Sequence, residues 1–153
     1  MTSKIRHQGI LAVHLFLMDE NKVLLLRRFH TGYEDGKYSV PAGHVEKGEG
    51  ALEAMVRETK EEIGIKLQKK SLQLVHCMHR QRLDEGNERV DFFFTVPEWN
   101  GEPKICEPDK CDQLRWVGVT KLPQNMVPYV KKALKLSQKK QLYSEYGWNK
   151  EEQ

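Results

Sequence analysis

Short stretches of apolar residues alternate with polar turns along most of the chain, and this pattern predicts β-strands. Two longer segments, 50–63 and 124–136, are predicted to be helices. The order is therefore strands, helix, strands, helix. It predicts an α/β (α+β) fold in which a mixed β-sheet is sandwiched between α-helices. The predicted strands are 9–18, 22–28, 38–40, 71–82, 89–96 and 113–119.

The first predicted helix has a well-defined apolar stripe. Its apolar positions recur at intervals of three and four residues, which places them on one face of a helix. Gly64 follows the last of them and is suited to end the helix as a C-terminal cap. The stripe consists of Leu52, Met55, Val56, Thr59 and Ile63.

The chain shows no internal repeat, low-complexity tract or linker, so we expect a single domain over residues 1–153. Its core is expected at about 9–137, followed by a C-terminal tail, 138–153. The tail contains three aromatic residues, Tyr143, Tyr146 and Trp148. They could pack on the domain, pack on a second subunit, or stay loose, and the sequence leaves these alternatives open.

The composition is ordinary for a globular protein, with 39% hydrophobic and 31% charged residues. A net charge of +3 is too small to indicate a nucleic-acid polymer as partner. We find no apolar run long enough to span a bilayer and no secretory signal, so we expect a cytoplasmic protein. Three cysteines without a CxxC pair indicate neither a disulfide framework nor a zinc site. The sequence does not distinguish a monomer from a homodimer.

Three carboxylates share a second face of the first helix. At 100° per residue, Glu58, Glu61 and Glu62 fall within an arc of about 100°, which we expect to lie well away from the apolar stripe. Such neighbours repel one another, and a hard divalent cation such as Mg2+ would convert this repulsion into coordination. The alternative is a solvated acidic face, with Arg57 and Lys60 as local partners.

The spacing around these carboxylates resembles a known motif. The segment GHVEKGEGALEAMVRETKEEIGI, residues 43–65, resembles the Nudix box, usually written G-x5-E-x7-R-E-U-x-E-E-x-G-U with U an apolar residue. Every fixed position matches, and only Thr59 replaces an apolar residue. The resemblance to MutT-like members continues on both sides of the box and spans roughly 9–136. It includes the approach 38–44, where Ala42 replaces a family glycine.

Membership of the Nudix family would imply the cleavage of a diphosphate bond by metal-activated water, with Mg2+ as cofactor and Mn2+ as the alternative ion. The matching residues would assign Glu58, Glu61 and Glu62 to the metal cluster, with the Gly43 backbone carbonyl as a further ligand. Either Glu58 or Glu61 would take the proton from water. Arg57 would orient a catalytic glutamate by a charge-assisted hydrogen bond.

Three further residues have both a functional and a structural interpretation. Glu107 lies where MutT-type members place a later metal-binding carboxylate, but it could equally be an exposed loop residue. Arg28, at the end of a strand, could contact a substrate phosphate or solvent, and Arg27 would face the opposite way in a regular strand. Asn125 resembles the asparagine with which MutT-type members read a purine base. Aromatic rings near the box, such as Tyr33, could line a base pocket.

The resemblance thus implies an enzyme that hydrolyses a nucleoside di- or triphosphate, or a nucleoside diphosphate linked to another group, to a nucleoside monophosphate. Two alternatives share the fold: a module that senses a nucleotide without cleaving it, and a prenyl-diphosphate isomerase. The intact set of Arg57, Glu58, Glu61 and Glu62 argues against the first alternative. The short chain and the lack of a catalytic cysteine context argue against the second.

Overall fold

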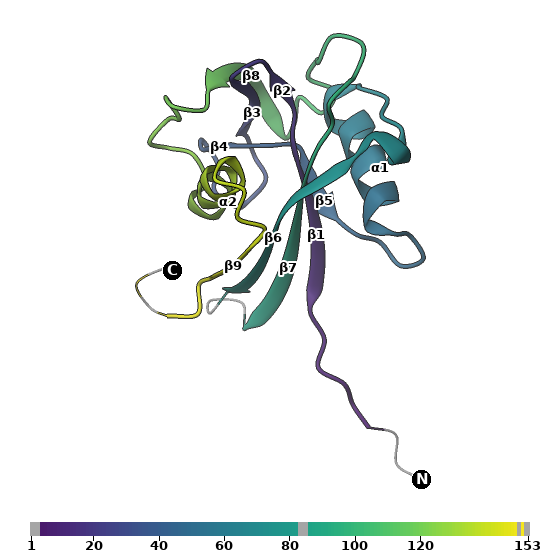
Figure 1. Ribbon diagram of the computed structural model, residues 1–153, viewed down its shortest axis with the longest axis vertical. Helices are drawn as coiled ribbons and strands as arrows, with labels where there is room; N and C mark the ends of the chain where they lie inside the picture. The colour runs from purple at the N-terminus through teal and green to yellow at the C-terminus, as the bar shows by residue number, and fades with distance from the viewer. Residues whose placement is uncertain (1–3, 83–85, 150, 152–153) are drawn as a thin grey trace.

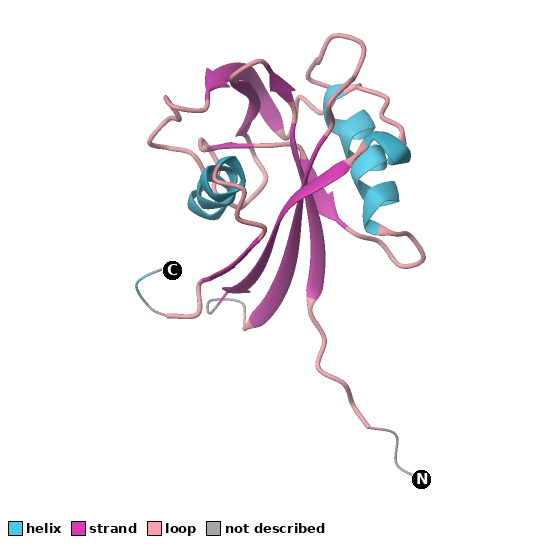
Figure 2. Ribbon diagram, viewed as in Figure 1, coloured by secondary structure: helices cyan, strands magenta, loops and turns pink. Residues whose placement is uncertain are grey.

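The computed structural model describes residues 4–82, 86–149 and 151, which form two β-sheets and two α-helices (Figures 1 and 2). The larger sheet has five strands in the order β5-β1-β7-β6-β9. β1 pairs in parallel with β7 and antiparallel with β5, so this sheet is mixed, as predicted. Its strands are β1 (Ile10–Phe16), β5 (Ala42–His44), β6 (Gln73–Arg82), β7 (Asn87–Thr95) and β9 (Tyr143–Tyr146).

A second, antiparallel sheet covers one end of the larger one, near the top of Figure 1. Its strand β3 pairs with all three of the others. Pro41 interrupts the chain between β4 and β5, so the two short strands join different sheets. The strands of the second sheet are β2 (Met18–Asp19), β3 (Lys22–Arg28), β4 (Tyr38–Ser39) and β8 (Cys111–Gly118).

The two α-helices, α1 (Ala51–Ile63) and α2 (Pro128–Gln138), lie on opposite sides of the larger sheet (Figure 1). Successive side chains of β1 point to opposite faces of the sheet. Val13 and Leu15 therefore join the apolar core beneath α1, while Phe16 joins the core beneath α2. The predicted arrangement of a mixed sheet between helices is confirmed.

The buried face of α1 is rotated slightly from the predicted stripe. Met55, Thr59 and Ile63 are fully buried, as predicted, but Leu52 is 37% exposed and the smaller Ala54 is buried instead. The hydroxyl of Thr59 donates to the Met55 carbonyl oxygen over 2.7 Å, so this polar side chain is satisfied inside the core. The substitution of threonine at an apolar position of the box is thereby accommodated without an unpaired group.

The same rotation turns part of the acidic arc towards the sheet. Two of the three carboxylates are therefore partly covered: the Glu58 side chain is only 16% exposed and Glu62 is half-buried. Glu61 remains 50% exposed. The periodicity alone could not show this, since α1 packs against both β1 and the edge strand β5.

The ends of the helices depend on single residues. Gly64 adopts a left-handed φ of 73°, and its N–H donates to the Lys60 carbonyl oxygen, which confirms the predicted C-terminal cap. α2 begins at Pro128 rather than at residue 124, because proline is favoured in the first turn of a helix.

The C-terminal tail packs on the domain as an additional strand. β9 pairs in parallel with β6, and the Cys77 N–H donates to the Leu142 carbonyl oxygen over 2.8 Å. The His76 ring also lies 2.8 Å from the Ser144 hydroxyl and 2.7 Å from the Gln141 carbonyl oxygen. Of the alternatives that the sequence left open for the tail, the first is therefore found.

The turn between the predicted strands 71–82 and 89–96 lies partly outside the described residues. Within residues 4–82, 86–149 and 151, we find no helix that is long and apolar enough to cross a membrane.

Candidate active site

A cavity of about 750 Å³ gathers most of the residues that the sequence singled out. Its walls come from α1, from β5, from the end of β3 and from β6 and β7. Asn125 is not among the lining residues, because its side-chain amide donates to the Gly36 carbonyl oxygen instead. The predicted residues that do line the cavity are Arg28, Gly43, Arg57, Glu58, Glu61, Glu62 and Glu107.

Gly43 leaves the space that the carboxylate of Glu58 occupies. A Cβ atom at position 43 would overlap the Glu58 carboxyl group. On the preceding residue, the Ala42 N–H donates to Glu62 Oε2 over 2.8 Å. β5 and α1 thus fit together through two glutamates, and residue 43 has to be glycine for this approach.

We expect Gly43→Ala to destabilise the protein by about 1–3 kcal/mol, because the new methyl group has to displace the Glu58 carboxylate or β5. The free energy of unfolding in denaturant measures the change. Gly118→Ala is the matched control, since a Cβ atom there would meet no atom within 4 Å. Equal stability of the two variants would contradict the close fit described for Gly43.

Two carboxyl groups in the cavity, those of Glu58 and Glu62, have a raised pKa. Burial raises the pKa of Glu58, and the charges of Glu61 and Glu107 raise it further against the opposing effect of Arg57. Burial also raises the pKa of Glu62 well above its usual range, and the charge of Glu58 adds to the shift. These groups are therefore costly to ionise together, and a nearby cation would relieve that cost.

Arg57 holds this cluster in place. Its Nη1 donates to Glu58 Oε1 over 2.8 Å, and its Nη2 donates to Glu49 Oε1 over 2.7 Å and to the His44 carbonyl oxygen over 3.1 Å. The hydrogen bond to Glu49 is the main reason why the pKa of Arg57 is raised. The Arg57 guanidinium group is thereby fixed between the loop before α1 and the catalytic candidate Glu58. A residue that orients Glu58 would have to lie there.

The donor set fits a hard divalent cation. Glu58, Glu61, Glu62 and Glu107 supply carboxylate oxygens to one cavity, and oxygen is the ligand atom that Mg2+ prefers. Within the described ranges, no three His, Cys, Asp or Glu side chains are already arranged to hold an ion. Arg57 bonds to two of the carboxylates, so they would have to reorient on binding a metal.

Both arginines at the end of β3 line the cavity, although a regular strand would separate them. The register of β3 against β8 shifts between Arg27 and Arg28, which changes the direction of the side chains. Arg27 forms two hydrogen bonds with Asp112, of 2.7 and 2.9 Å. Arg28 donates to the Tyr33 carbonyl oxygen over 2.6 Å, which orders the loop that follows. Arg27 was expected to face the opposite way only in a regular strand, and the strand is irregular at this point.

Sequence reasoning did not predict a buried polar group of His14, Arg80 and Asp91 beside the cavity, which His14 and Arg80 line. Asp91 is fully buried, and it lies 3.1 Å from His14 Nε2 and 2.7 Å from Arg80 Nε. The Arg80 guanidinium lies 3.7 Å from the centre of the Tyr129 ring. These residues occur in separate elements, and the only sequence sign of them is a charged or polar residue inside an otherwise apolar strand.

This buried group should make stability depend on pH in the acid range. Burial by itself would raise the pKa of Asp91, but its hydrogen bonds and the charges of His14 and Arg80 outweigh that effect and lower it to about 2. A lowered pKa stabilises the folded state above the unfolded value, near 3.8, and the contribution of about 2 kcal/mol is lost as pH falls towards 2.

Denaturant unfolding between pH 6 and pH 2 measures this dependence, with Asp91→Asn as the reference. The stability advantage of the unsubstituted chain should shrink below pH 4. If the difference in the free energy of unfolding between the unsubstituted chain and Asp91→Asn stayed constant from pH 6 to pH 2, the ionisation of Asp91 would not be the source of the stabilisation.

Comparison with known proteins agrees with this arrangement. The chain matches the NUDIX domain family over residues 9–137. It is 27% identical over 129 residues to an 8-oxo-dGTP diphosphatase of Escherichia coli, covering 82% of this chain and 96% of that protein. It is 42% identical over 99 residues to an ADP-ribose pyrophosphatase of Methanocaldococcus jannaschii, covering 65% of this chain and 57% of that protein.

Solved structures show the same architecture. A MutT NUDIX hydrolase from Burkholderia pseudomallei superposes with a TM-score of 0.77 at 26% identity, over 84% of this chain and 98% of the other. A MutT protein from Bacillus halodurans superposes with a TM-score of 0.74 at 25% identity, over 94% of this chain and 93% of the other. The matched family region ends before β9 begins.

Proposed function

This chain belongs to the Nudix family as a MutT-like hydrolase, and from that membership we propose that it hydrolyses a diphosphate bond with the help of Mg2+. The proposed substrate is a nucleoside di- or triphosphate, or a nucleoside diphosphate linked to another group. The organic product is then of the nucleoside monophosphate type. The names of the two relatives, an 8-oxo-dGTP diphosphatase and an ADP-ribose pyrophosphatase, support a nucleotide substrate.

One observation carries the proposal: the carboxylates of Glu58 and Glu62 converge at β5, where Gly43 leaves space for Glu58 and the Ala42 N–H donates to Glu62. Two partly buried carboxylates that repel each other lower the stability of the fold. A helix face that served only for packing would not need them. Glu61 and Glu107 line the same cavity. Together the four carboxylates supply the negative charge that would hold a cation between the protein and a diphosphate.

We assign Glu58, Glu61, Glu62 and the Gly43 carbonyl to hold Mg2+, with Glu107 as a further ligand. Mn2+, which accepts similar oxygen ligands, should replace Mg2+. A bound ion neutralises the diphosphate and lowers the pKa of coordinated water.

The remaining steps belong to side chains of this chain. Glu58 or Glu61 accepts the proton of the attacking water, and Arg57 orients Glu58. We assign Arg28, which lines the same cavity, to a phosphate oxygen of the substrate.

A panel of nucleoside triphosphates, nucleotide sugars and dinucleoside polyphosphates tests the proposal, with phosphate and monophosphate release as the readout. We expect turnover of at least one class with Mg2+, its loss with a chelator, and its return with Mn2+. Binding of nucleotides without any turnover would replace the hydrolase by a nucleotide-sensing module. The role of Asn125 in base recognition stays a prediction, because its side chain does not line the cavity.

A further inference from the structure

Lys110, which lines the cavity, has a partner that it can exchange at little cost. Its Nζ atom lies 3.7 Å from Glu107 Oε2, which is longer than a hydrogen bond, and the two side chains are 60% and 30% exposed. Among residues 4–82, 86–149 and 151, Glu107 is the one residue whose side chain pairs with that of Lys110. A long ion pair that is open to water contributes little to stability. The Lys110 ammonium group is therefore available to a stronger anion.

The neighbouring cations at the end of β3 are bound more firmly than Lys110. Arg27 donates to both carboxylate oxygens of Asp112, over 2.7 and 2.9 Å. Arg28 donates to the Tyr33 carbonyl oxygen over 2.6 Å. Within the part of the chain that the structure describes, the Lys110 side chain can turn without breaking a hydrogen bond, whereas those of Arg27 and Arg28 cannot.

The backbone of Lys110 is fixed, in contrast to its side chain. The Lys110 N–H donates to the Glu107 carbonyl oxygen over 2.9 Å, which closes a tight turn. The Lys110 carbonyl oxygen accepts from the Phe29 N–H over 2.9 Å, and this bond ties the turn to the end of β3. The next residue, Cys111, pairs with Arg28. Lys110 thus lies beside the arginine that we assign to a phosphate oxygen, and an exchange of partners needs only a rotation of the lysine side chain.

Glu107 connects Lys110 with the acidic cluster, by which we mean Glu58, Glu61 and Glu62. Glu107 lines the same cavity, and its charge contributes to the raised pKa of Glu58 and of Glu62. A cation held by these carboxylates would also attract Glu107 and weaken its hold on Lys110. The cleaved diphosphate is proposed to lie at that cation, so its phosphate groups would lie next to an ammonium group on a flexible four-carbon stem.

We propose that Lys110 binds a phosphate group of the substrate, and that it leaves Glu107 for this phosphate when Glu107 helps to hold the divalent cation. This inference rests on the proposed function, which places the cation and the cleaved diphosphate at the acidic cluster. A point charge on a flexible stem suits a phosphate that is present only in the complex. The free protein keeps the positive charge of Lys110 beside a carboxylate, and the complex uses it on the substrate.

Lys110→Gln separates this role from a purely structural one, because its two expected effects have opposite signs. Binding of Mn2+ in the absence of any phosphate should stay the same or tighten by up to about fivefold, since the competitor for Glu107 is removed. Binding of methylenediphosphonate, a diphosphate analogue whose P–C–P bridge resists hydrolysis, should weaken about tenfold or more with saturating Mg2+. Electron paramagnetic resonance of free Mn2+ and calorimetry measure the two dissociation constants.

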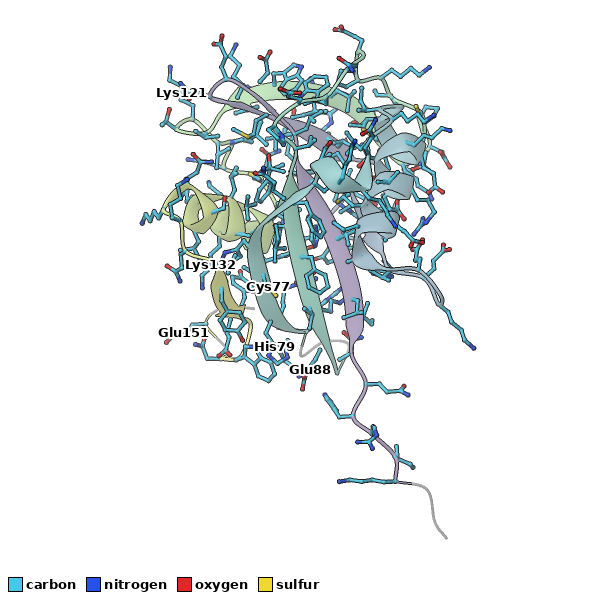
Figure 3. All side chains as sticks on the ribbon, turned by 45° about the vertical axis from the view of Figure 1, so that its right-hand side comes forward. Cys77, His79, Glu88, Lys121, Lys132 and Glu151 are labelled. Carbon is cyan, nitrogen blue, oxygen red and sulfur yellow. The ribbon has the colours of Figure 1, made fainter. Side chains whose placement is uncertain are left out.

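Three further variants serve as controls. Lys110→Arg keeps the charge and should bind methylenediphosphonate within about threefold of the unsubstituted chain. Lys104→Gln removes the same charge from the same loop, but Lys104 is exposed and is not among the described residues that line the cavity. Lys121→Gln removes it from an exposed position on the side of the molecule away from α1 (Figure 3). The last two variants should leave both dissociation constants within about twofold, because water and salt screen their charges.

The outcomes separate this inference from the function it builds on. If Lys110→Gln left the affinity for methylenediphosphonate unchanged, or if the unsubstituted chain did not bind this analogue, the inference would fail even though nucleotides were hydrolysed. If Lys110→Gln weakened the binding of Mn2+ and of the analogue alike, Lys110 would serve only the structure of its loop, and the inference would also fail. If Lys110 controlled binding of the analogue but no nucleotide of the panel was turned over, the proposed hydrolysis would fail and the phosphate site would stand.

Discussion

Glu62→Gln is expected to reduce the rate of diphosphate hydrolysis by on the order of 10²-fold or more while the fold stays intact. The side-chain oxygen of glutamine can still accept the hydrogen bond from the Ala42 N–H, so the junction of α1 and β5 is kept. The negative charge, in contrast, is lost. Because burial and the charge of Glu58 already raise the pKa of Glu62, removing that charge also removes a repulsion.

Stability should therefore stay the same or rise slightly as activity falls, which is the relation expected of a residue kept for function. Steady-state rates and the free energy of unfolding are the two measurements. Glu53→Gln is the matched control, because Glu53 is an exposed glutamate of α1 whose contact is Lys69, at 3.4 Å. If Glu62→Gln kept full activity, the assignment of Glu62 to the metal would be wrong.

Asp91→Ala is expected to destabilise the protein by about 3–5 kcal/mol, because it leaves a buried charge without its partner. Asp91 is fully buried and accepts hydrogen bonds from Arg80 of 2.7 and 3.3 Å. Arg80 cannot turn to solvent easily, since it lies against the Tyr129 ring. The loss should appear in denaturant unfolding at neutral pH.

Asp112→Ala provides the comparison for this second substitution. Asp112 also forms two hydrogen bonds with an arginine, Arg27, but both side chains are partly exposed, at 31% and 40%. Water can replace those bonds, so the expected cost is about 0–1 kcal/mol. Similar costs for Asp91→Ala and Asp112→Ala would show that burial of the first pair does not control its contribution.

The sequence predicted those features of the fold that depend on local spacing. The period of the apolar residues identified α1, and Gly64 identified its end. The spacing of the Nudix box identified Gly43, Arg57 and the three helix glutamates, Glu58, Glu61 and Glu62. The structure brings all five residues to one cavity. All of these residues lie in one continuous segment, from β5 to the end of α1.

Features that depend on distant pairing were not predictable in this way. The rotation of α1 towards β5 is set by packing, and no local period reveals it. The register shift between Arg27 and Arg28 arises from the pairing of β3 with β8. Likewise, Arg80 and Asp91 become neighbours only when β6 and β7 pair, so the sequence gives no sign of their buried ion pair.

The C-terminal strand has a consequence for the behaviour of the protein in concentrated solution. Without β9, the long strand β6 would be the outermost strand of the larger sheet, and its free backbone N–H and C=O groups could recruit strands from other molecules. With β9 present, the outermost strand is β9 itself, which has only four residues, Tyr143–Tyr146. It therefore exposes far fewer unpaired backbone groups than β6 would. The residues of β9, which follow the matched family region, therefore reduce the tendency of the larger sheet to aggregate edge to edge.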